Sequence, residues 1–357
     1  MVINMELIFL DRDDLKVLDF GYVEKEFTIV IDSVIPQKSN FNVNSVNVNA
    51  EVGDLVVVKD PEVNYIGIIT SIQVDEDKMI SKVQTTDFIS ILDIKVKLSS
   101  FSGNVSLNLY NLITNTYKTN SDSKQNISYL SVSRDYASVT GALTFEPDTI
   151  DSISSVVKTL NKAFSIGVKY NLVYDNGTIS GIELHIVSCT KGFILKSNYK
   201  GITKLVINSS GEQSVNKVVF YPSNENVTYK SIVNYYLLTD GTISTNASSD
   251  KRYKSIKSIA KIYKDADYSA LQTTAQSEML TSSLEHSITF NLETKNKVVK
   301  PFIDINVGDF IEFITPTKTY ETMVTQLSFK NNLYEVYVTL GEYRISLTDK
   351  IKLLSNK

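Results

Sequence analysis

The stretch EVGDLVVVKDPEVNYIGIITSIQ, residues 51–73, occurs a second time in the chain as NVGDFIEFITPTKTYETMVTQLS, residues 306–328. The offset is 255 positions (306 minus 51) and needs no gap. The identical pairs are Val52/Val307, Gly53/Gly308, Asp54/Asp309, Pro61/Pro316, Tyr65/Tyr320, Thr70/Thr325 and, further on, Val83/Val338. The apolar matches between them are Leu55/Phe310, Val56/Ile311, Ile69/Val324, Ile72/Leu327 and Val74/Phe329.

Each stretch predicts a strand entered through a Val-Gly-Asp turn, a loop with proline, and a second strand that opens with tyrosine. Glycine permits the turn conformation, and the aspartate can bond nearby backbone amides. Two unrelated hairpins can share such residues, but here the spacing is kept from Gly53 through Val83. We therefore expect two copies of one small β-barrel flanking an inserted region, with Glu51–Phe88 and Asn306–Tyr343 in the same antiparallel arrangement.

The remaining pattern indicates a mainly β fold with an α+β middle region. The first hundred residues are β-rich runs with turns such as VIPQKSN (34–40) and VDEDK (74–78) between them. The strands predicted there are Met5–Leu10, Glu26–Ile31, Asp54–Lys59, Tyr65–Ile72 and Met79–Thr85. Close spacing without intervening helices favours a barrel or sandwich.

The middle region combines helical periodicity with a hairpin signal. Helices are predicted over Asn104–Thr119 and Asp151–Phe164, the second with Asp151 as its N-cap and Gly167 just beyond its end. The runs 169–174 and 181–187 flank DNGT, which predicts a hairpin.

A second strand-rich region begins near Leu205 and includes one helix, Asp267–Ser283. Its predicted strands are Val215–Tyr221, Ser231–Leu238, His286–Leu292, Asp309–Ile314, Thr319–Leu327 and Tyr334–Leu340. We divide the chain into a first β-barrel domain (1–99), an inserted α+β domain (100–202), a mixed β/α connecting domain (203–285) and a second β-barrel part (286–357).

Composition argues against several function classes. With 357 residues and a net charge of −4, the chain has no polybasic face for nucleic acid or anionic lipid. Cys189 is the single cysteine, so neither an intrachain disulfide nor a Cys-based zinc site is expected. No run is long enough to span a membrane, and the first residues lack a secretion signal. We expect synthesis and folding in a host cytoplasm.

No residue is assigned to a catalytic, cofactor-binding or metal site. His185 lies in an apolar strand and is expected to be a satisfied, partly buried side chain, and His286 has no spaced partner for a metal. Cys189 is expected to be an inert thiol. The acidic runs 11–14 and 75–77 are expected to be a solvated turn and a hairpin tip. No nucleotide, metalloprotease or nucleophile-elbow motif occurs.

Several stretches resemble the baseplate hub, or tail-associated protein, of tailed phages and prophages of Gram-positive bacteria. The stretches are MELIFLDRDD (5–14), VGDLVVV (52–58), YIGIITSIQ (65–73), DFISILD (87–93), YYLLTDGTIST (235–245), HSITFNLE (286–293), VGDFIEF (307–313), TYETMVTQLSF (319–329) and VTLGEYRISLTDKIKLL (338–354). They are patterns of hydrophobic residues spread over nearly the whole chain, and they supply no catalytic residue.

The resemblance implies a virion structural protein of the tail tip, a homotrimer that joins the tail tube to the distal tip. Expected partners are the tail tube or distal tail protein, the tape measure, and a fibre or spike. Because the sequence ends shortly after GEYRISLTDK, we expect a hub alone, with lytic or receptor-binding activity on another chain. The alternatives are a cell-wall-degrading enzyme, which would need an unrecognised carboxylate or metal site, and a receptor- or carbohydrate-binding tail protein.

Overall fold

The computed structural model describes residues 5–23, 26–32, 37–60, 63–135, 139–143, 145, 148–209, 215–223, 228, 231–238, 242–252, 258–283 and 286–341. The chain divides into two compact units. The first contains the described residues up to Leu205 together with Thr289–Leu340, and the second contains those of Val206–Ile288 together with Gly341. The GEYRISLTDK motif lies outside the described residues from its second position onward.

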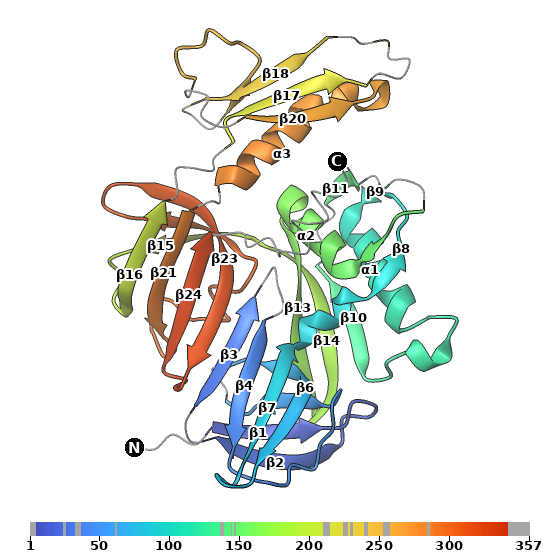
Figure 1. Ribbon diagram of the computed structural model, residues 1–357, viewed down its shortest axis with the longest axis vertical. Helices are drawn as coiled ribbons and strands as arrows, with labels where there is room; N and C mark the ends of the chain where they lie inside the picture. Colours follow the sequence, from blue (N-terminus) through green and yellow to red (C-terminus); the bar gives the residue numbers. More distant parts are fainter. Residues whose placement is uncertain are drawn as a thin grey trace. The chain divides into compact units, whose positions relative to one another are not determined.

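The largest sheet combines strands from both ends of the chain (Figure 1), and the mainly β class is confirmed. Its strands are β1 (Met5–Leu10), β2 (Val17–Val23), β3 (Phe27–Asp32), β4 (Lys38–Val43), β5 (Leu55–Val58), β6 (Ile66–Asp75), β7 (Ile80–Asp87), β15 (Thr190–Lys196), β16 (Ile202–Ser209), β21 (His286–Glu293), β22 (Phe310–Ile314), β23 (Thr319–Lys330) and β24 (Glu335–Gly341). Along the main path the order is β16-β21-β24-β23-β3-β4-β7-β6-β5-β1-β2, and β22 lies between β23 and β15.

The internal repeat is confirmed for the described residues. We call residues 51–88 the first repeat and residues 306–341 the second. Strands β5, β6 and β7 of the first repeat pair antiparallel in the order of β22, β23 and β24 of the second. Cross-strand partners agree after the shift of 255: Leu55–Ile68 with Phe310–Met323, Val56–Gly67 with Ile311–Thr322, and Ile72–Val83 with Leu327–Val338.

Even the irregularity of the ladder recurs in the two repeats. A bulge lies between Ile69 and Ser71 in the first repeat and between Val324 and Gln326 in the second. A bulge places an extra residue opposite its partner strand and increases the local twist. The two repeats therefore share a bent backbone as well as an apolar pattern.

The expectation of closed β-barrels is wrong. The run of strands that includes the first repeat ends at β2, which forms a ladder only with β1 among the described strands. It reaches the end of β4 through a backbone hydrogen bond from Asn44 N to Tyr22 O (2.9 Å). In the second repeat, the edge of β23 that would have to pair within its own barrel pairs with β3 instead. This pairing joins the two ends of the chain. Both repeats are parts of one open sheet.

The middle region is α+β, as expected. Two helices, α1 (Val105–Tyr117) and α2 (Ile153–Phe164), pack against a sheet of order β10-β14-β13. The sheet strands are β10 (Leu130–Arg134), β13 (Ile166–Asp175) and β14 (Thr178–Ser188). Two short strand pairs and two 3-10 helices complete the region: β8 (Lys95–Lys97) with β12 (Ile150–Ser152), β9 (Phe101–Asn104) with β11 (Thr140–Leu143), and η1 (Phe88–Asp93) and η2 (Ser123–Gln125).

Local rules account for most boundaries in the middle region. The predicted hairpin is β13–β14, whose turn residues Asn176 and Gly177 have φ values of 49° and 82°, as a tight two-residue turn requires. The N-cap of α2 is Ser152, not Asp151, because the Ser152 hydroxyl accepts the N–H of Ser155 (3.2 Å). The helix ends at Ser165 in a left-handed conformation, before Gly167.

A continuous apolar core joins the first repeat to the middle region. Its buried members include Leu55 and Ile66 from the first repeat and Leu109, Leu160 and Leu184 from α1, α2 and β14. Burial of apolar area stabilises such a core by roughly 25 cal/mol per Å². The middle region is therefore packed on the first repeat.

The second unit has its own sheet and core. The sheet has the order β19-β18-β17-β20, with strands β17 (Lys217–Pro222), β18 (Val233–Leu237), β19 (Ile243–Ser244) and β20 (Ser258–Tyr263). The predicted helix is observed as η3 (Asp265–Ala270) followed by α3 (Leu271–Ser283). The buried residues Phe220, Leu271 and Met279 form the core between this sheet and α3.

The sequence patterns missed several strands, among them β2 and β4 of the large sheet. Strand β2 contains aspartate and glycine and β4 contains two asparagines, residue types that are depleted in strands. Residues 38–40 of the predicted turn VIPQKSN lie in β4, so that part of the prediction is wrong. Pairing with β1 and β7 outweighs the local preference in these segments.

Candidate functional site

His185 lies on β14 and uses both ring nitrogens. Its Nδ1 is 2.6 Å from Ser133 Oγ and its Nε2 is 3.0 Å from Asp135 Oδ1, with 28% of the side chain exposed. The expectation of a satisfied, partly buried strand histidine is confirmed. The bond from His185 is the main cause that holds the pKa of Asp135 below its ordinary value.

The order serine, histidine, carboxylate is also that of an activated nucleophile with its base. Here Ser133 and His185 are direct cross-strand neighbours on the parallel strands β10 and β14. Asp135 additionally accepts the backbone N–H of Ser188 (3.0 Å). The three side chains thus hold β10 against β14. Any test for enzymatic activity has to include a variant of this group.

The other residues named from the sequence are His286, Cys189 and the two acidic runs. His286 and Cys189 are buried, at the start of β21 and between β14 and β15. The backbone of Cys189 accepts the N–H of Phe310 at 3.0 Å, which joins the end of β14 to the second repeat. The acidic run 11–14 forms the turn between β1 and β2, and the run 75–77 forms the tip of the β6–β7 hairpin, as expected.

The two Val-Gly-Asp turns are built from the same bonds. Gly53 N donates to Ile69 O (2.9 Å), and Gly308 N donates to Val324 O (2.7 Å). Both glycines have positive φ, 101° and 89°, which other residues rarely adopt.

The aspartates of the turns also act alike. Asp54 Oδ2 accepts the N–H of Glu51 at 2.8 Å, and Asp309 Oδ2 accepts the N–H of Asn306 at 2.9 Å. The turn-forming role predicted for Asp54 and Asp309 is confirmed.

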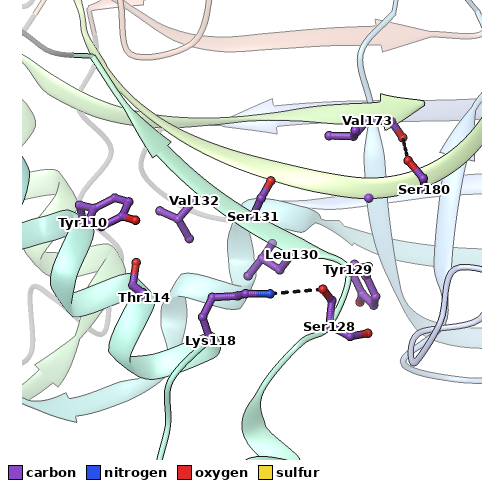
Figure 2. A pocket seen from close by; sticks show the side chains of 11 residues that line it. Tyr110, Thr114, Lys118, Ser128, Tyr129, Leu130, Ser131, Val132, Val173 and Ser180 are labelled. Atoms are coloured by element: carbon purple, nitrogen blue, oxygen red, sulfur yellow. Dashed lines mark hydrogen bonds between the residues drawn. The ribbon is translucent and has the colours of Figure 1, made fainter. Parts of the chain in front are cut away.

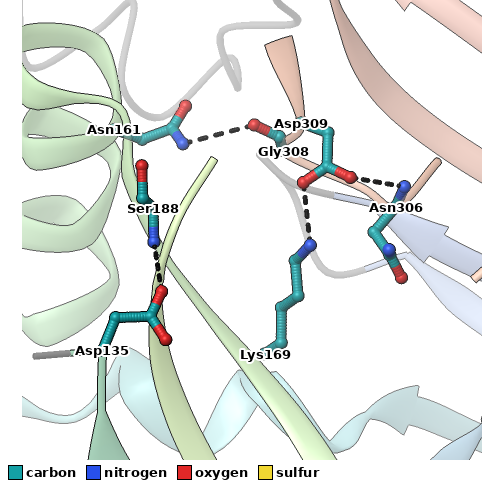
Figure 3. Close-up of polar contacts among 7 residues, drawn as sticks. All are labelled: Asp135, Asn161, Lys169, Ser188, Asn306, Gly308 and Asp309. Atoms are coloured by element: carbon teal, nitrogen blue, oxygen red, sulfur yellow. Dashed lines mark hydrogen bonds and ion pairs between the residues drawn. The ribbon is translucent and has the colours of Figure 1, made fainter. Parts of the chain in front are cut away.

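The second carboxylate oxygen distinguishes the two turns. Asp54 Oδ1 accepts the backbone N–H of Arg12 (3.3 Å), whereas Asp309 Oδ1 accepts the Lys169 ammonium (2.8 Å). Figure 3 shows Lys169 reaching Asp309 from β13, with Asn161 of α2 donating to Gly308 O (3.4 Å) beside it. The Asp309 side chain is fully buried and that of Lys169 is 22% exposed. The second turn is therefore a docking point for the middle region.

The neighbouring residue on β13 makes the corresponding contact with the first repeat. Tyr170 accepts the N–H of Ile66 at 3.3 Å and donates to Asp87 Oδ2 at 3.1 Å. Its ring packs edge-on against Phe88. The Asn64 side chain donates to Tyr170 O (3.1 Å). Lys169 and Tyr170 thus fasten β13 to the two repeats.

The Asp87 carboxyl group is buried in this junction. Burial raises the pKa of Asp87 to about 7, although bonds from Ile89 N and Tyr170 favour the charged form. Burial also raises the pKa of Tyr170 and Tyr65 well above the ordinary value, with Asp87 as the second cause. Sequence reasoning missed Asp87, Lys169 and Tyr170 as junction residues, because nothing in one sequence identifies partners 83 to 140 positions away.

A cavity of about 500 Å³ lies between α1, β10 and the β13–β14 hairpin. Figure 2 shows Tyr110 and Thr114 on α1, Lys118 just beyond the end of this helix, and Tyr129 on the strand side. The Lys118 ammonium donates to the carbonyl oxygens of Ile127 (3.1 Å) and Ser128 (3.2 Å). The Thr114 hydroxyl is buried with no hydrogen-bond partner. The cavity thus offers a cation and hydroxyl groups.

In the described part of the chain, no group of three or more His, Cys, Asp or Glu side chains is placed to hold a metal ion. Among the same residues, no helix is long and apolar enough to cross a membrane.

No family model and no curated protein sequence matches the chain. Solved structures do. The prophage tail protein gp18 from Listeria monocytogenes EGD-e is 12% identical, with a TM-score of 0.55 and 99% of each chain covered. The 43 kDa tail protein of prophage MuSo2 from Shewanella oneidensis is 9% identical, with a TM-score of 0.55 and coverage of 95% of this chain and 98% of that one.

A chain from a topological model of the p2 virion baseplate in its activated conformation is 13% identical, with a TM-score of 0.50 and coverage of 94% and 98%. At these identities the likeness concerns the fold. The chain has the fold of phage tail and baseplate proteins over nearly its whole length.

Proposed function

We propose that the chain is a structural baseplate hub of a phage or phage-like tail tip, a homotrimeric ring that joins the tail tube to the distal tip. The observation that carries the proposal is the repeat, which keeps turn, register and bulge across 255 positions (306 minus 51) within a fold shared with tail and baseplate proteins. Three chains with two repeats each present six like units around one axis. Closed rings are a common outcome of heterologous contacts.

The proposal includes the partners and the place of action that the sequence resemblance implies. The hub would contact the tail tube or distal tail protein, the tape measure, and a fibre or spike, at the tip of the virion tail. We keep the fourfold division at residues 99/100, 202/203 and 285/286 as part of this proposal.

The oligomeric state tests the proposal directly. Light scattering over a concentration series should show a species of about 120 kDa, three times the chain mass of 40.0 kDa. Binding to other copies stabilises the folded state by mass action, so the trimer fraction should rise with concentration. Cryo-imaging of tail tips should count three copies. A chain that stays monomeric at every concentration and is present as six copies per tip, or absent from it, would refute the threefold hub.

The proposal also includes the absence of enzymatic activity. Zymography on purified cell wall should show no lysis band at 40.0 kDa. Ser133→Ala is the decisive variant, because it removes the hydroxyl beside His185 without touching the repeats. A band that is present in the wild type and lost in this variant would overturn the structural assignment.

The cavity beside α1 favours a second candidate function, recognition of an acidic saccharide on a cell surface. The two hydrogen-bond partners of Lys118 are backbone carbonyl groups and not carboxylates, and Tyr110 and Tyr129 line the same cavity. Glycan-array binding by the wild type should be lost in Lys118→Met and kept in Lys124→Met, a control on η2 outside the cavity. Equal binding by both variants would exclude the cavity as the site.

A further inference from the structure

The chain joins its two ends through one strand contact. Strand β3 pairs antiparallel with the last residues of β23, from Asp32 opposite Gln326 to Thr28 opposite Lys330. The apolar residues of this part of β23 are buried, Leu327 at 0% exposure and Phe329 at 1%. The contact is thus a complete strand-to-strand junction within the large sheet.

The equivalent edge in the first repeat has no such partner. Residues 71–75 of β6 correspond to residues 326–330 of β23, and among the described strands they pair only with β7. Val74, the counterpart of Phe329, is 48% exposed, and Ile72, the counterpart of Leu327, is only partly buried. An unpaired strand edge with apolar side chains is a site for pairing with another chain.

A counterpart of β3 also exists in the chain. Strand β3 pairs with β4, which pairs with β7 of the first repeat; β16 pairs with β21, which pairs with β24 of the second repeat. Strand β16 stands at the end of the described run of strands, and among these strands it pairs only with β21. Its residues Thr203, Lys204 and Val206 are exposed, whereas β3 has only buried or half-buried residues.

We propose that the β6 edge, residues 71–75, receives β16 of a neighbouring chain, as the β23 edge receives β3 within the chain. This contact rests on the proposed function as a homotrimeric hub, and its two surfaces would close the ring of three chains. Because β6 and β16 are different surfaces, the contact is heterologous and can repeat around an axis. Pairing of two β6 edges would instead give a twofold dimer and leave β16 uncovered.

A charge on the β6 edge tests the surface without disturbing the isolated fold. Val74→Asp places a carboxylate at a position that is 48% exposed in the single chain and that the neighbouring chain would cover in the ring. An unpaired buried charge is strongly unfavourable, so the ring should be destabilised. The dissociation constant of the trimer should rise by a factor on the order of tenfold or more. Met79→Asp is the matched control, since Met79 is 64% exposed on the same hairpin but outside the edge. Equal trimer formation by both variants would overturn the proposal.

Cross-linking separates failure of this surface from failure of the hub. Val74→Cys combined with Thr203→Cys or Val206→Cys should give chain-to-chain products up to three chains with a short bis-maleimide, in solution and in purified tail particles. Native Cys189 is buried and should not react. In the control, Tyr174→Cys replaces Val74→Cys, because Tyr174 is also exposed but lies outside the β6 edge. This control should not give the products.

Three results would count against the proposal. A trimer by light scattering or imaging without these products would overturn the β6–β16 contact and leave the hub intact. Products that stop at two chains would indicate that the chains pair as a dimer in place of the ring. No trimer and no products, in solution and in particles, would refute both proposals.

Discussion

The two repeats have the same backbone but different neighbours. Turn, register and bulge agree, yet β5 is flanked by β1 in an antiparallel pair, whereas β22 is flanked by β15 in a parallel pair. The repeated residues therefore determine only the three-stranded unit itself. What pairs with its open edges depends on which segment the rest of the chain brings there, so duplicated units can serve different contacts.

The same difference separates the junctions with β13. Tyr170 donates a hydrogen bond to the buried Asp87 carboxyl group of the first repeat, whereas Lys169 forms an ion pair with the buried Asp309 of the second repeat. One strand thus holds two like units by different chemistry.

The largest expected effect is a pH dependence of stability at the first junction. The pKa of Asp87 is about 7 in the fold and 3.8 ordinarily, so the folded state binds the extra proton between these values. Stability should therefore fall as pH rises from about 4 to about 7, by up to about 4 kcal/mol for this group. Asp87→Asn should flatten the fall in urea titrations at pH 4.5 and 8.

A matched variant isolates the Asp87 contribution. Asp19→Asn alters a half-buried carboxylate on β2, outside this junction, and should keep the wild-type slope with pH. An Asp87→Asn protein with the same slope as the wild type would show that the junction does not titrate.

The second effect is a difference in the free energy of unfolding that is lost when each turn aspartate is replaced by alanine. Asp309→Ala removes the partner of the mostly buried Lys169 ammonium, a loss of about 3 kcal/mol for a buried pair. Asp54→Ala loses bonds to two backbone N–H groups and should cost about 1–2 kcal/mol. Chemical denaturation of both variants measures the difference. Equal losses would mean that the Lys169 contact adds nothing to the second turn.

The sequence predicted the repeated unit because its determinants are local. Gly53 and Gly308 indicate the turns, and the alternation of apolar residues indicates the strands, so register and turn position were recovered. Strands β2 and β4 were missed because they contain residue types that are depleted in strands, although β2 pairs with β1 and β4 pairs with β3 and β7. The prediction of closure failed for another reason, since the pairing of β3 with β23 joins residues about 300 positions apart and has no local signal.

The third effect tests whether the turns are equivalent. Alanine at Gly53 or Gly308 would adopt φ near 101° or 89°, at a cost of about 1–3 kcal/mol of backbone strain in each case. A new Cβ at Gly53 meets only the flexible end of Arg12, and at Gly308 it makes ordinary contacts with Asn161 and Cys189. Both variants should therefore lose similar stability in thermal unfolding. A loss confined to one of them would show that the turns share a sequence but not a role.

The smallest effect compares two threonines at the bulges. Thr70 donates to Gln84 O and Thr325 donates to Thr339 O, each at 3.2 Å, but only Thr325 is buried. Replacing Thr325 by valine leaves a buried carbonyl oxygen without this donor and should cost about 1–2 kcal/mol, whereas water can replace the Thr70 hydroxyl, so Thr70→Val should cost about 0.5 kcal/mol. Urea unfolding of the monomer measures both losses. In a ring where β16 of a neighbouring chain covers the edge beside Thr70, water has less access and the two losses should converge with rising protein concentration. A gap that stays constant from monomer to trimer would place the neighbouring chain elsewhere.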